Sequence, residues 1–589
     1  MIQPQEKFIN DIMSLIREGI VLTFGGLFMV KNSKGKKWSL KRKIITAVLL
    51  TPLAIVLIVL LIFSPAIVYY GRMLYVTSEI DGHQIDTTLT MDQKLEDFDY
   101  MYEIVCLSNP NKERIEKACG ISYDDIRDRY RELILNSKTD YEYFSLMACF
   151  LGVLPGQHNV MQVPDYYNNT QSFLLSEIYA SQEMRDYAYS WKEEFRDDVQ
   201  EYRQHSLYMF HYIDGKYIGI KGNSRLFSFA NEYALGQIVT IDGRDPNDMC
   251  FEFLLRESVN YDQGNDIYFR PNLYFNDGIG EPHTVEILMP DGNTVTTTLY
   301  EAAGFEIALT DAPSTYPEMF ASSSSESASA GSDTAVSDAP KTYTIYKDPE
   351  GKFVYVNSTS CTSDEGDRLA EDMTLALNET GADTVIFDVR SNGGGVTGFC
   401  NRQVLPALFS HDLEYPTDSY GIKNDFTRCF YNDLYYRIYF ERPIKVEGDN
   451  YFVHEDFNVE GKAAKNYKIY LLTSYSTFSS ADLMTCLCKA YDNATVVGTN
   501  TGGEGICGTP FHCYLPNSHF MFNYTSTANV NVPENNFMGT SPDIYIPYTV
   551  EEFCKRSELL NQGLDVNSFE VRMMYDKTLN YVVDLAANG

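Results

Sequence analysis

Residues 385–395, Val-Ile-Phe-Asp-Val-Arg-Ser-Asn-Gly-Gly-Gly, pass from an apolar run into three consecutive glycines. The apolar part predicts a buried strand over Thr384–Val389, and the glycines predict a loop that leads into a helix. Glycines at such a junction leave backbone N–H groups able to face a phosphate or an oxyanion. A nucleotide-binding P-loop needs Gly-Lys-Ser/Thr, which this stretch lacks, so the nucleotide interpretation is the weaker one.

A second strand-to-helix junction lies at residues 471–482, Leu-Leu-Thr-Ser-Tyr-Ser-Thr-Phe-Ser-Ser-Ala-Asp. We expect a strand over Tyr467–Leu472 and a helix over Ser480–Tyr491. A serine at a helix N-terminus, here Ser479, is commonly only a cap. The same position also suits a nucleophile, because the helix dipole and unpaired N–H groups stabilise negative charge that develops beside it.

In this order the two segments resemble motifs of the tail-specific, or C-terminal-processing, serine peptidase family. Members of that family carry D-x-R-x-N-x-G-G, then S-A-S-E, G-x-x-T-x-G and G-x-x-P-D-I. The corresponding segments here are Asp388–Gly395, Ser479–Asp482, Gly498–Gly503 and Gly539–Ile544. The resemblance covers roughly Met91–Ile546. It implies a serine endopeptidase that hydrolyses polypeptides through an acyl-enzyme, with no cofactor and no metal.

By this resemblance Ser479 corresponds to the nucleophile, and the backbone N–H groups of Gly395 and Ser480 correspond to the oxyanion hole. The better-known branch of the family has a catalytic lysine where this chain has Glu504. A carboxylate cannot act as a neutral amine base, so a Ser-Lys dyad is not expected. The chain is more similar to the Ser-His-Glu branch of the tricorn core protease, which implies His158 as the general base.

The acid that orients the base has two candidates. Glu534 precedes the Gly539–Ile544 motif, as the acid does in the Ser-His-Glu branch, and Glu504 is the alternative. His512 and His519 follow the nucleophile and are the remaining alternatives to His158 as the base.

The pattern of residues changes several times along the chain. Helical spacing of apolar residues gives way to short strands separated by turns, then to small polar residues, and then to alternating strands and helices. We therefore expect a cytoplasmic basic segment (1–43), a transmembrane helix (44–70), a helical domain (90–205), a PDZ-like domain (206–305), a flexible linker (312–340), an α/β peptidase core (341–560) and a C-terminal extension (561–589).

The expected fold class is α/β, and the resemblance implies a catalytic core of the ClpP/crotonase type. The run Leu235–Gly243 in the strand-rich part resembles a segment of PDZ domains, which bind extended peptide ends by strand addition. A small β domain without a peptide groove is the alternative for this part of the chain.

The uncharged stretch Ile44–Tyr70 is long enough to cross a bilayer, at roughly 40 Å as a helix. Lysine and arginine cluster between Lys31 and Lys43, which predicts a cytoplasmic N-terminus. The basic lead and the long apolar run favour an uncleaved anchor over a signal peptide. We therefore expect a single-pass protein of the cell membrane with an extracytoplasmic catalytic part.

The formal net charge is -34, although the nine Lys/Arg up to Lys43 outnumber the three Asp/Glu there, so the rest of the chain is still more acidic. An acidic body of this kind disfavours binding to nucleic acid. The 12 cysteines lack zinc-site spacing, and Cys106 and Cys119 are either free thiols or a disulfide across a small loop. The competing functional hypothesis is a catalytically inactive family member that binds peptides or apolar ligands.

Overall fold

The computed structural model describes residues 82–156, 158–164, 182–220, 232–309, 341–427, 444–506, 511–530 and 539–588. The predicted transmembrane helix at 44–70 and the predicted linker at 312–340 lie outside these ranges. Within these ranges no helix is long and apolar enough to cross a membrane.

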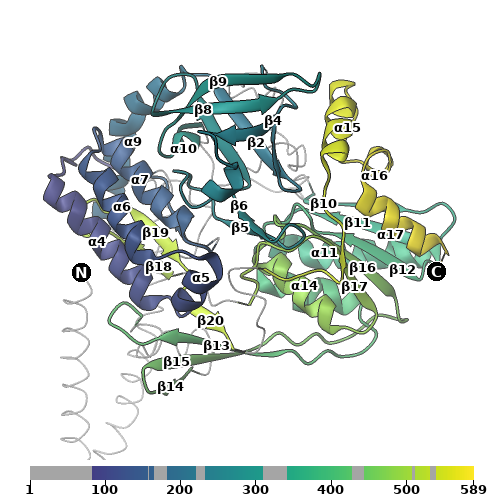
Figure 1. The fold of residues 1–589 in the computed structure, drawn as a ribbon. Coiled ribbons are helices and arrows are strands. Elements are labelled where there is room, and N and C mark those ends of the chain that lie inside the picture. Colours follow the sequence, from purple (N-terminus) through teal and green to yellow (C-terminus); the bar gives the residue numbers. More distant parts are fainter. Residues whose placement is uncertain are drawn as a thin grey trace, which may run out of the picture. The chain divides into compact units, whose positions relative to one another are not determined.

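The N-terminal described part is helical, as the spacing of its apolar residues predicts (Figure 1). Its helices are α4 (Met91–Ser108), α5 (Lys112–Cys119), α6 (Tyr123–Leu135), α7 (Asp140–Val153) and α9 (Gln182–Tyr202). Thr90, Ser122 and Thr139 cap α4, α6 and α7 through side-chain hydrogen bonds to backbone N–H groups. Every residue of α7 from Tyr143 to Val153 is buried, so this helix forms the centre of the helical part.

The strand-rich part forms a closed barrel in the order β2-β3-β4-β8-β9-β7 (Figure 1). Its strands are β2 (Leu207–Ile213), β3 (Lys216–Gly219), β4 (Gln237–Ile241), β7 (Asn272–Asn276), β8 (Glu281–Leu288) and β9 (Thr294–Glu301). Between β4 and β7 lie η3 (Pro246–Met249) and the hairpin β5 (Asn260–Asp262) and β6 (Ile267–Phe269), and α10 (Phe305–Leu309) follows β9. The expected strands are therefore present, and the PDZ-like peptide groove stays a prediction.

A six-stranded sheet in the order β10-β11-β12-β16-β17-β21 forms the centre of the α/β part. Its strands are β10 (Tyr343–Lys347), β11 (Phe353–Ser358), β12 (Thr384–Asp388), β16 (Lys468–Thr473), β17 (Ala494–Gly498) and β21 (Ile544–Tyr545). All neighbouring pairs are parallel except β10 with β11. The carboxyl ends of β12, β16 and β17 therefore meet at one edge, where both motifs begin.

Alternate residues of each strand point to opposite faces of this sheet, and helices cover both faces. The helices are α11 (Ser363–Thr380), η4 (Phe399–Val404), η5 (Leu405–Ala407), α14 (Ser480–Ala490), α15 (Val550–Asn561), α16 (Phe569–Arg572) and α17 (Lys577–Asn588). Helices α11 and α14 share one hydrophobic cluster with the sheet, and α17 shares the other. Residues 561–589, expected as an extension, thus belong to the packing of the core, with Leu579 and Val582 fully buried on the sheet.

Two smaller sheets connect the helical part to the peptidase part. One contains β1 (Val160–Met161), β18 (Phe511–Tyr514) and β19 (Met521–Tyr524), and the other contains β13 (Pro416–Ile422), β14 (Ile444–Glu447), β15 (Asn450–Asp456) and β20 (Thr527–Asn529). Val160 pairs with Asn523 across the first of these sheets. This pairing holds the segment just after His158 against β19. That strand follows α14, β17 and β18 along the chain.

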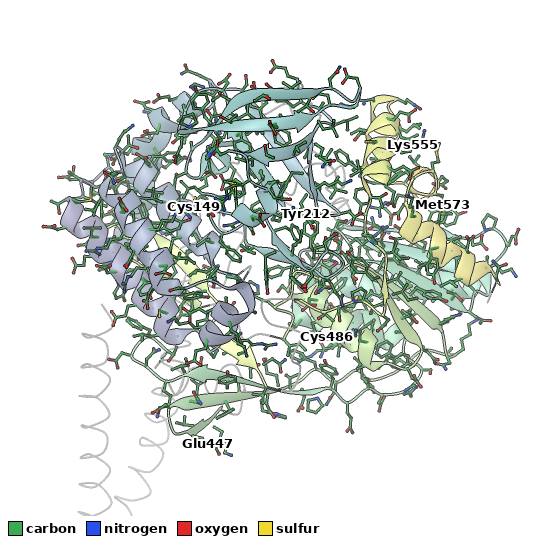
Figure 2. The ribbon with its side chains drawn as sticks, in the orientation of Figure 1. Cys149, Tyr212, Glu447, Cys486, Lys555 and Met573 are labelled. Carbon is green, nitrogen blue, oxygen red and sulfur yellow. The ribbon has the colours of Figure 1, made fainter. Side chains whose placement is uncertain are left out.

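Cys106 and Cys119 are both free thiols. The disulfide considered for that pair is therefore absent. Cys149 of α7 and Cys486 of α14, both labelled in Figure 2, are buried in the separate cores of the helical and α/β parts.

Candidate active site

Ser479 occupies the sharp turn between strand β16 and helix α14. It is the N-cap residue of α14, yet its side chain makes no capping hydrogen bond. Its backbone has φ 54° and ψ -123°, a left-handed conformation that costs a non-glycine residue roughly 1–3 kcal/mol. A strained serine that does not cap its helix is the arrangement of a nucleophile held at a strand-to-helix turn.

The glycine loop after β12 lies directly against this serine. A Cβ atom built on Gly394 would lie 2.7 Å from Cβ of Ser479, and one built on Gly395 would lie 2.3 Å from the carbonyl oxygen of Cys361. Both glycines have positive φ values, 94° and 141°. The approach of the serine turn therefore requires glycine at 394, and the close contact with Cys361 requires it at 395.

The two residues whose N–H groups are expected to form the oxyanion hole, Gly395 and Ser480, are in contact at this junction. The Ser480 hydroxyl donates to the carbonyl oxygen of Gly395 at 2.7 Å, which joins the two loops. The N–H groups of Gly395 and Ser480 make no hydrogen bond to another residue in the described ranges. Donors at the N-terminus of α14 and in a glycine loop suit the charge of an oxyanion.

The His158 imidazole contacts the Glu504 carboxylate beside the nucleophile loop. The His158 Nδ1 atom lies 2.5 Å from Oε2 of Glu504, and the His158 backbone N–H donates to the same oxygen at 3.0 Å. The His158 ring centroid lies 4.6 Å from that of Phe478, the residue that precedes Ser479. A neutral imidazole that donates from Nδ1 has Nε2 as its proton acceptor, which is the state a general base needs.

Glu504 is held in place from several sides. Its side chain is 4% exposed, and Oε1 accepts a hydrogen bond from the Thr525 hydroxyl at 3.2 Å. Its φ of 59° is again unusual for a residue other than glycine. The carbonyl oxygen of the preceding residue, Gly503, accepts the Ser479 N–H at 3.0 Å, so one short segment contacts both the nucleophile and the histidine.

Asp482 holds the segment around Glu504 in place through two hydrogen bonds. It is fully buried, and it accepts hydrogen bonds from the Thr501 hydroxyl at 2.6 Å and from the Gly505 N–H at 2.9 Å. Asp482 is the last residue of the Ser479–Asp482 motif, so the sequence could have indicated that it supports the site. Thr525 has no comparable motif in the sequence.

A buried ion network supports the strand end that leads into the glycine loop. Arg390 binds Asp388 at 2.7 Å and Asp576 at 2.6 Å, and Arg572 binds Asp388 at 2.8 Å. Burial alone would raise the pKa of the Asp388 carboxyl, but the Arg390 and Arg572 guanidiniums hold that pKa well below its usual range. Arg390 is thus a structural partner at the strand end, and the sequence gives no sign that Arg572 and Asp576 belong to this network.

The remaining candidates for the acid and the base are Glu534, His512 and His519. Glu534 lies outside the described residues, and so does the side chain of His512. The His519 ring stacks on Tyr187 of α9 with centroids 3.9 Å apart. Among the described residues no group of three or more His, Cys, Asp or Glu could hold a metal ion.

Comparison with known proteins assigns the class of this site. Residues 352–546 match the sequence profile described as Peptidase family S41, and no curated protein matches the chain. The match covers the sheet apart from β10, and it includes the glycine loop and the serine turn. This segment is similar to that family, and the chain is a serine peptidase, a hydrolase.

Three solved peptidase structures resemble the chain as a whole. Mature CPAF complexed with lactacystin is 15% identical over 85% of this chain and 100% of that one, with a TM-score of 0.47. The photosystem II D1 C-terminal processing protease is 13% identical over 78% and 94%, with a TM-score of 0.31. The tricorn protease is 14% identical over 85% and 37%, with a TM-score of 0.30. Because all three TM-scores lie below 0.5, the assignment rests on the family match and on the geometry of this chain.

Proposed function

We propose that this protein is a serine endopeptidase whose nucleophile is Ser479 and whose general base is His158, with Glu504 as the acid that orients the base. The contact between the His158 imidazole and the Glu504 carboxylate beside the serine turn carries this proposal. It supports a Ser-His-Glu mechanism and favours Glu504 over Glu534 for the role of the acid.

In the first half of the reaction, Nε2 of His158 accepts the proton of the Ser479 hydroxyl while the oxygen attacks the scissile carbonyl carbon. The N–H groups of Gly395 and Ser480 stabilise the negative oxygen of the tetrahedral intermediate, at roughly 3–4 kcal/mol for each donor. Glu504 stabilises the imidazolium that forms. His158 then donates its proton to the leaving amine, and the acyl-enzyme remains on Ser479.

In the second half, His158 accepts a proton from water, which attacks the acyl carbonyl carbon. The same two N–H groups stabilise the second tetrahedral intermediate. Its collapse releases the carboxyl product, and the proton held by His158 returns to the Ser479 oxygen. No step requires a group beyond the side chains and backbone of this chain.

We further propose that the protein is a single-pass protein of the cell membrane, anchored by Ile44–Tyr70 with its catalytic part extracytoplasmic. The support is the uncharged apolar stretch and the basic cluster before it. Retention of the full chain in membranes after alkaline carbonate extraction is the expected result. Release into the supernatant would contradict the anchor.

Degradation of casein, a generic unstructured substrate, by the purified full chain tests the enzymatic proposal. Ser479→Ala and His158→Ala are each expected to abolish cleavage. The matched control is His454→Ala, because that side chain is 43% exposed on β15. Cleavage that persists in Ser479→Ala would refute the assignment of the nucleophile.

A further inference from the structure

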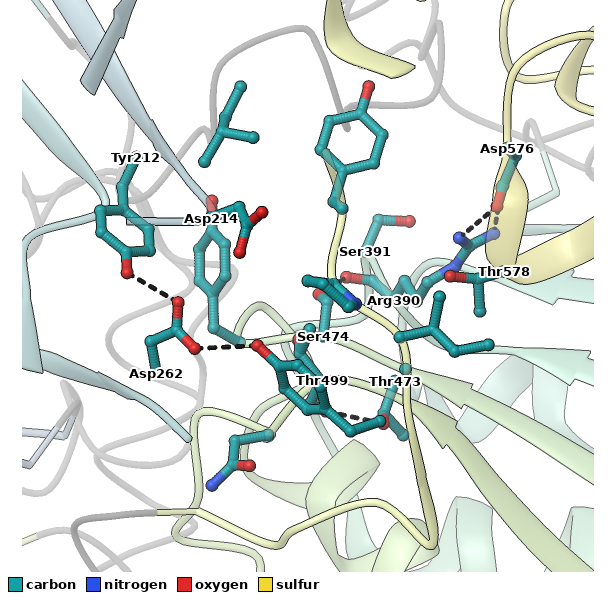
Figure 3. A pocket seen from close by; sticks show the side chains of 18 of the residues that line it. Tyr212, Asp214, Asp262, Arg390, Ser391, Thr473, Ser474, Thr499, Asp576 and Thr578 are labelled. Carbon is teal, nitrogen blue, oxygen red and sulfur yellow. Dashed lines mark hydrogen bonds and ion pairs between the residues drawn. The ribbon is translucent and has the colours of Figure 1, made fainter. Parts of the chain in front are cut away.

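A pocket separate from the serine turn lies between the barrel and the carboxyl edge of the six-stranded sheet (Figure 3). The space between its walls, counted together with the open solvent at its mouth, is about 1020 Å³. The barrel contributes residues of β2, the hairpin of β5 and β6 contributes others, and the sheet contributes the segments that follow β12, β16, β17 and β21. Ligands of parallel α/β sheets bind at this edge, outside the carboxyl ends of the strands.

The walls of the pocket are rich in aromatic rings. Phe269 stacks on Tyr212 with centroids 3.8 Å apart, and the Tyr475 ring meets Phe269 edge-on at 5.5 Å. The Tyr475 hydroxyl lies 3.1 Å from Nε2 of His211, a buried residue of the barrel. These contacts hold the rings in place before any ligand arrives. Faces and edges of fixed rings favour a further aromatic ring.

The charged groups labelled in Figure 3 already have partners within the protein. Asp262 accepts the hydroxyls of Tyr212 at 2.6 Å and Tyr545 at 2.9 Å, Asp214 accepts the Asn265 amide at 3.2 Å, and Arg390 binds Asp576. A charged ligand would have to displace these partners. The pocket therefore suits an uncharged ring.

The pocket also lies within reach of the nucleophile. Ser474 and Tyr475 line it, and they belong to the loop that ends at Ser479. Four residues of chain from Tyr475 span at most about 15 Å. A substrate in extended conformation covers that distance with about five residues.

We propose that this pocket is a substrate subsite that binds an uncharged aromatic side chain of the polypeptide, within about five residues of the scissile bond. This inference rests on the proposed function, because it assigns a specificity to the same active site.

Quenched fluorescent peptides test the subsite with the full chain. Each peptide carries tyrosine, phenylalanine or alanine at one position, scanned from one to six residues on either side of the cleaved bond. We expect kcat/KM to rise at least tenfold for an aromatic residue at one of these positions. Equal kcat/KM values for aromatic and alanine peptides at every position would overturn the inference.

A variant whose side chain fills the pocket provides the second test of the subsite. Gln263 lines the pocket and is exposed, so Gln263→Trp occludes it without disturbing a buried contact. The expected result is loss of the aromatic preference, with kcat/KM for alanine peptides within twofold of the original. Gln562→Trp, at an exposed position of the chain away from the pocket, is the matched control and is expected to keep the preference. If Gln263→Trp keeps the aromatic preference unchanged, the aromatic side chain of the substrate binds elsewhere and the inference is overturned.

Free N-acetyl-tyrosinamide separates a substrate subsite from a site for a small aromatic effector. It is expected to inhibit cleavage of the aromatic peptides and to leave the alanine peptides unaffected. A changed rate for alanine peptides would indicate an effector site and overturn the subsite. Dependence of all cleavage on Ser479 is checked in parallel, so that a failure of the proposed function is distinguished from a failure of this inference.

Discussion

Replacement of Glu504 by glutamine removes the charge that faces His158 and keeps the shape of the side chain. In the structure the carboxylate lies 2.5 Å from the His158 Nδ1 atom, and both side chains are largely buried, at 16% and 4% exposure. Loss of one partner of a buried charged pair costs roughly 3–5 kcal/mol. Because the imidazolium forms only during the reaction, we expect this cost in the transition state and a drop in kcat of roughly two to four orders of magnitude.

The assay is steady-state hydrolysis of one fluorogenic peptide by the wild-type chain and by Glu504→Gln. KM is expected to change little, because Glu504 acts on the base and not on the substrate. With its oxygen in the place of Oε2, the glutamine accepts the His158 N–H groups and its amide N–H donates to the Thr525 hydroxyl oxygen, so the melting temperature is expected to remain close to that of the wild type. Glu534→Gln is the matched control for the rival acid.

The outcome that refutes this reasoning is specific. If Glu504→Gln keeps kcat within threefold of the wild type, the carboxylate does not assist the base. A larger loss in Glu534→Gln than in Glu504→Gln would transfer the role to Glu534.

Three further predictions concern the surroundings of the site. Gly395→Ala is expected to lower kcat in the peptide assay at least 100-fold, because its Cβ would lie 2.3 Å from a backbone oxygen. Gly393→Ala is the control and is expected to have little effect, because a Cβ at that position would meet open space. Arg572→Met should lower the free energy of unfolding in urea by about 3–5 kcal/mol, because it leaves a buried carboxylate with one partner fewer, whereas Arg244→Met, in an exposed pair, should change it little. Burial lowers the pKa of His211 to about 4 from an ordinary value near 6.5, so the unfolded chain binds a proton in this window that the folded chain does not. The free energy of unfolding should therefore fall by about 3 kcal/mol as the pH drops from 6.5 to 4, and His211→Gln should flatten this slope in urea titrations at each pH.

Local features of the chain were sufficient to predict the centre of the fold. The apolar run before Asp388 and the one before Ser474 are short, and glycine or serine-rich turns follow both, which is typical of buried parallel strands. The structure places them as neighbouring strands β12 and β16, with Asp388 opposite Leu472. Strands whose ends lie at one edge bring their following loops together, and so the two motifs meet.

The contacts between distant segments could not be predicted in the same way. His158 and Glu504 are separated by 346 positions, and no periodicity links them. In the sequence, Glu534 was a candidate for the acid because it precedes the Gly539–Ile544 motif. In the structure, the hydrogen bond from the Ser479 N–H to the Gly503 carbonyl brings the neighbouring Glu504 close to the serine. Thr525, Arg572 and Asp576 were missed for the same reason, because packing alone assigns their partners.

The joining of the helical part to the peptidase part determines whether the base reaches the serine. His158 precedes β1, which pairs with β19, and rings of β19 such as Phe522 and Tyr524 are buried in the core of the helical part. The histidine therefore belongs to a region shared by both parts. A fragment that begins at Lys341 lacks it, and we expect that fragment to have no peptidase activity.

The central claim is that His158 activates Ser479. Mass spectrometry of the full chain after reaction with a fluorophosphonate measures this directly, since the probe forms a covalent adduct only with an activated serine. The account predicts one adduct, on the peptide that contains Ser479, formed by the wild-type chain and strongly reduced in folded His158→Ala. An adduct on another serine, or equal labelling in the wild type and His158→Ala, would contradict it.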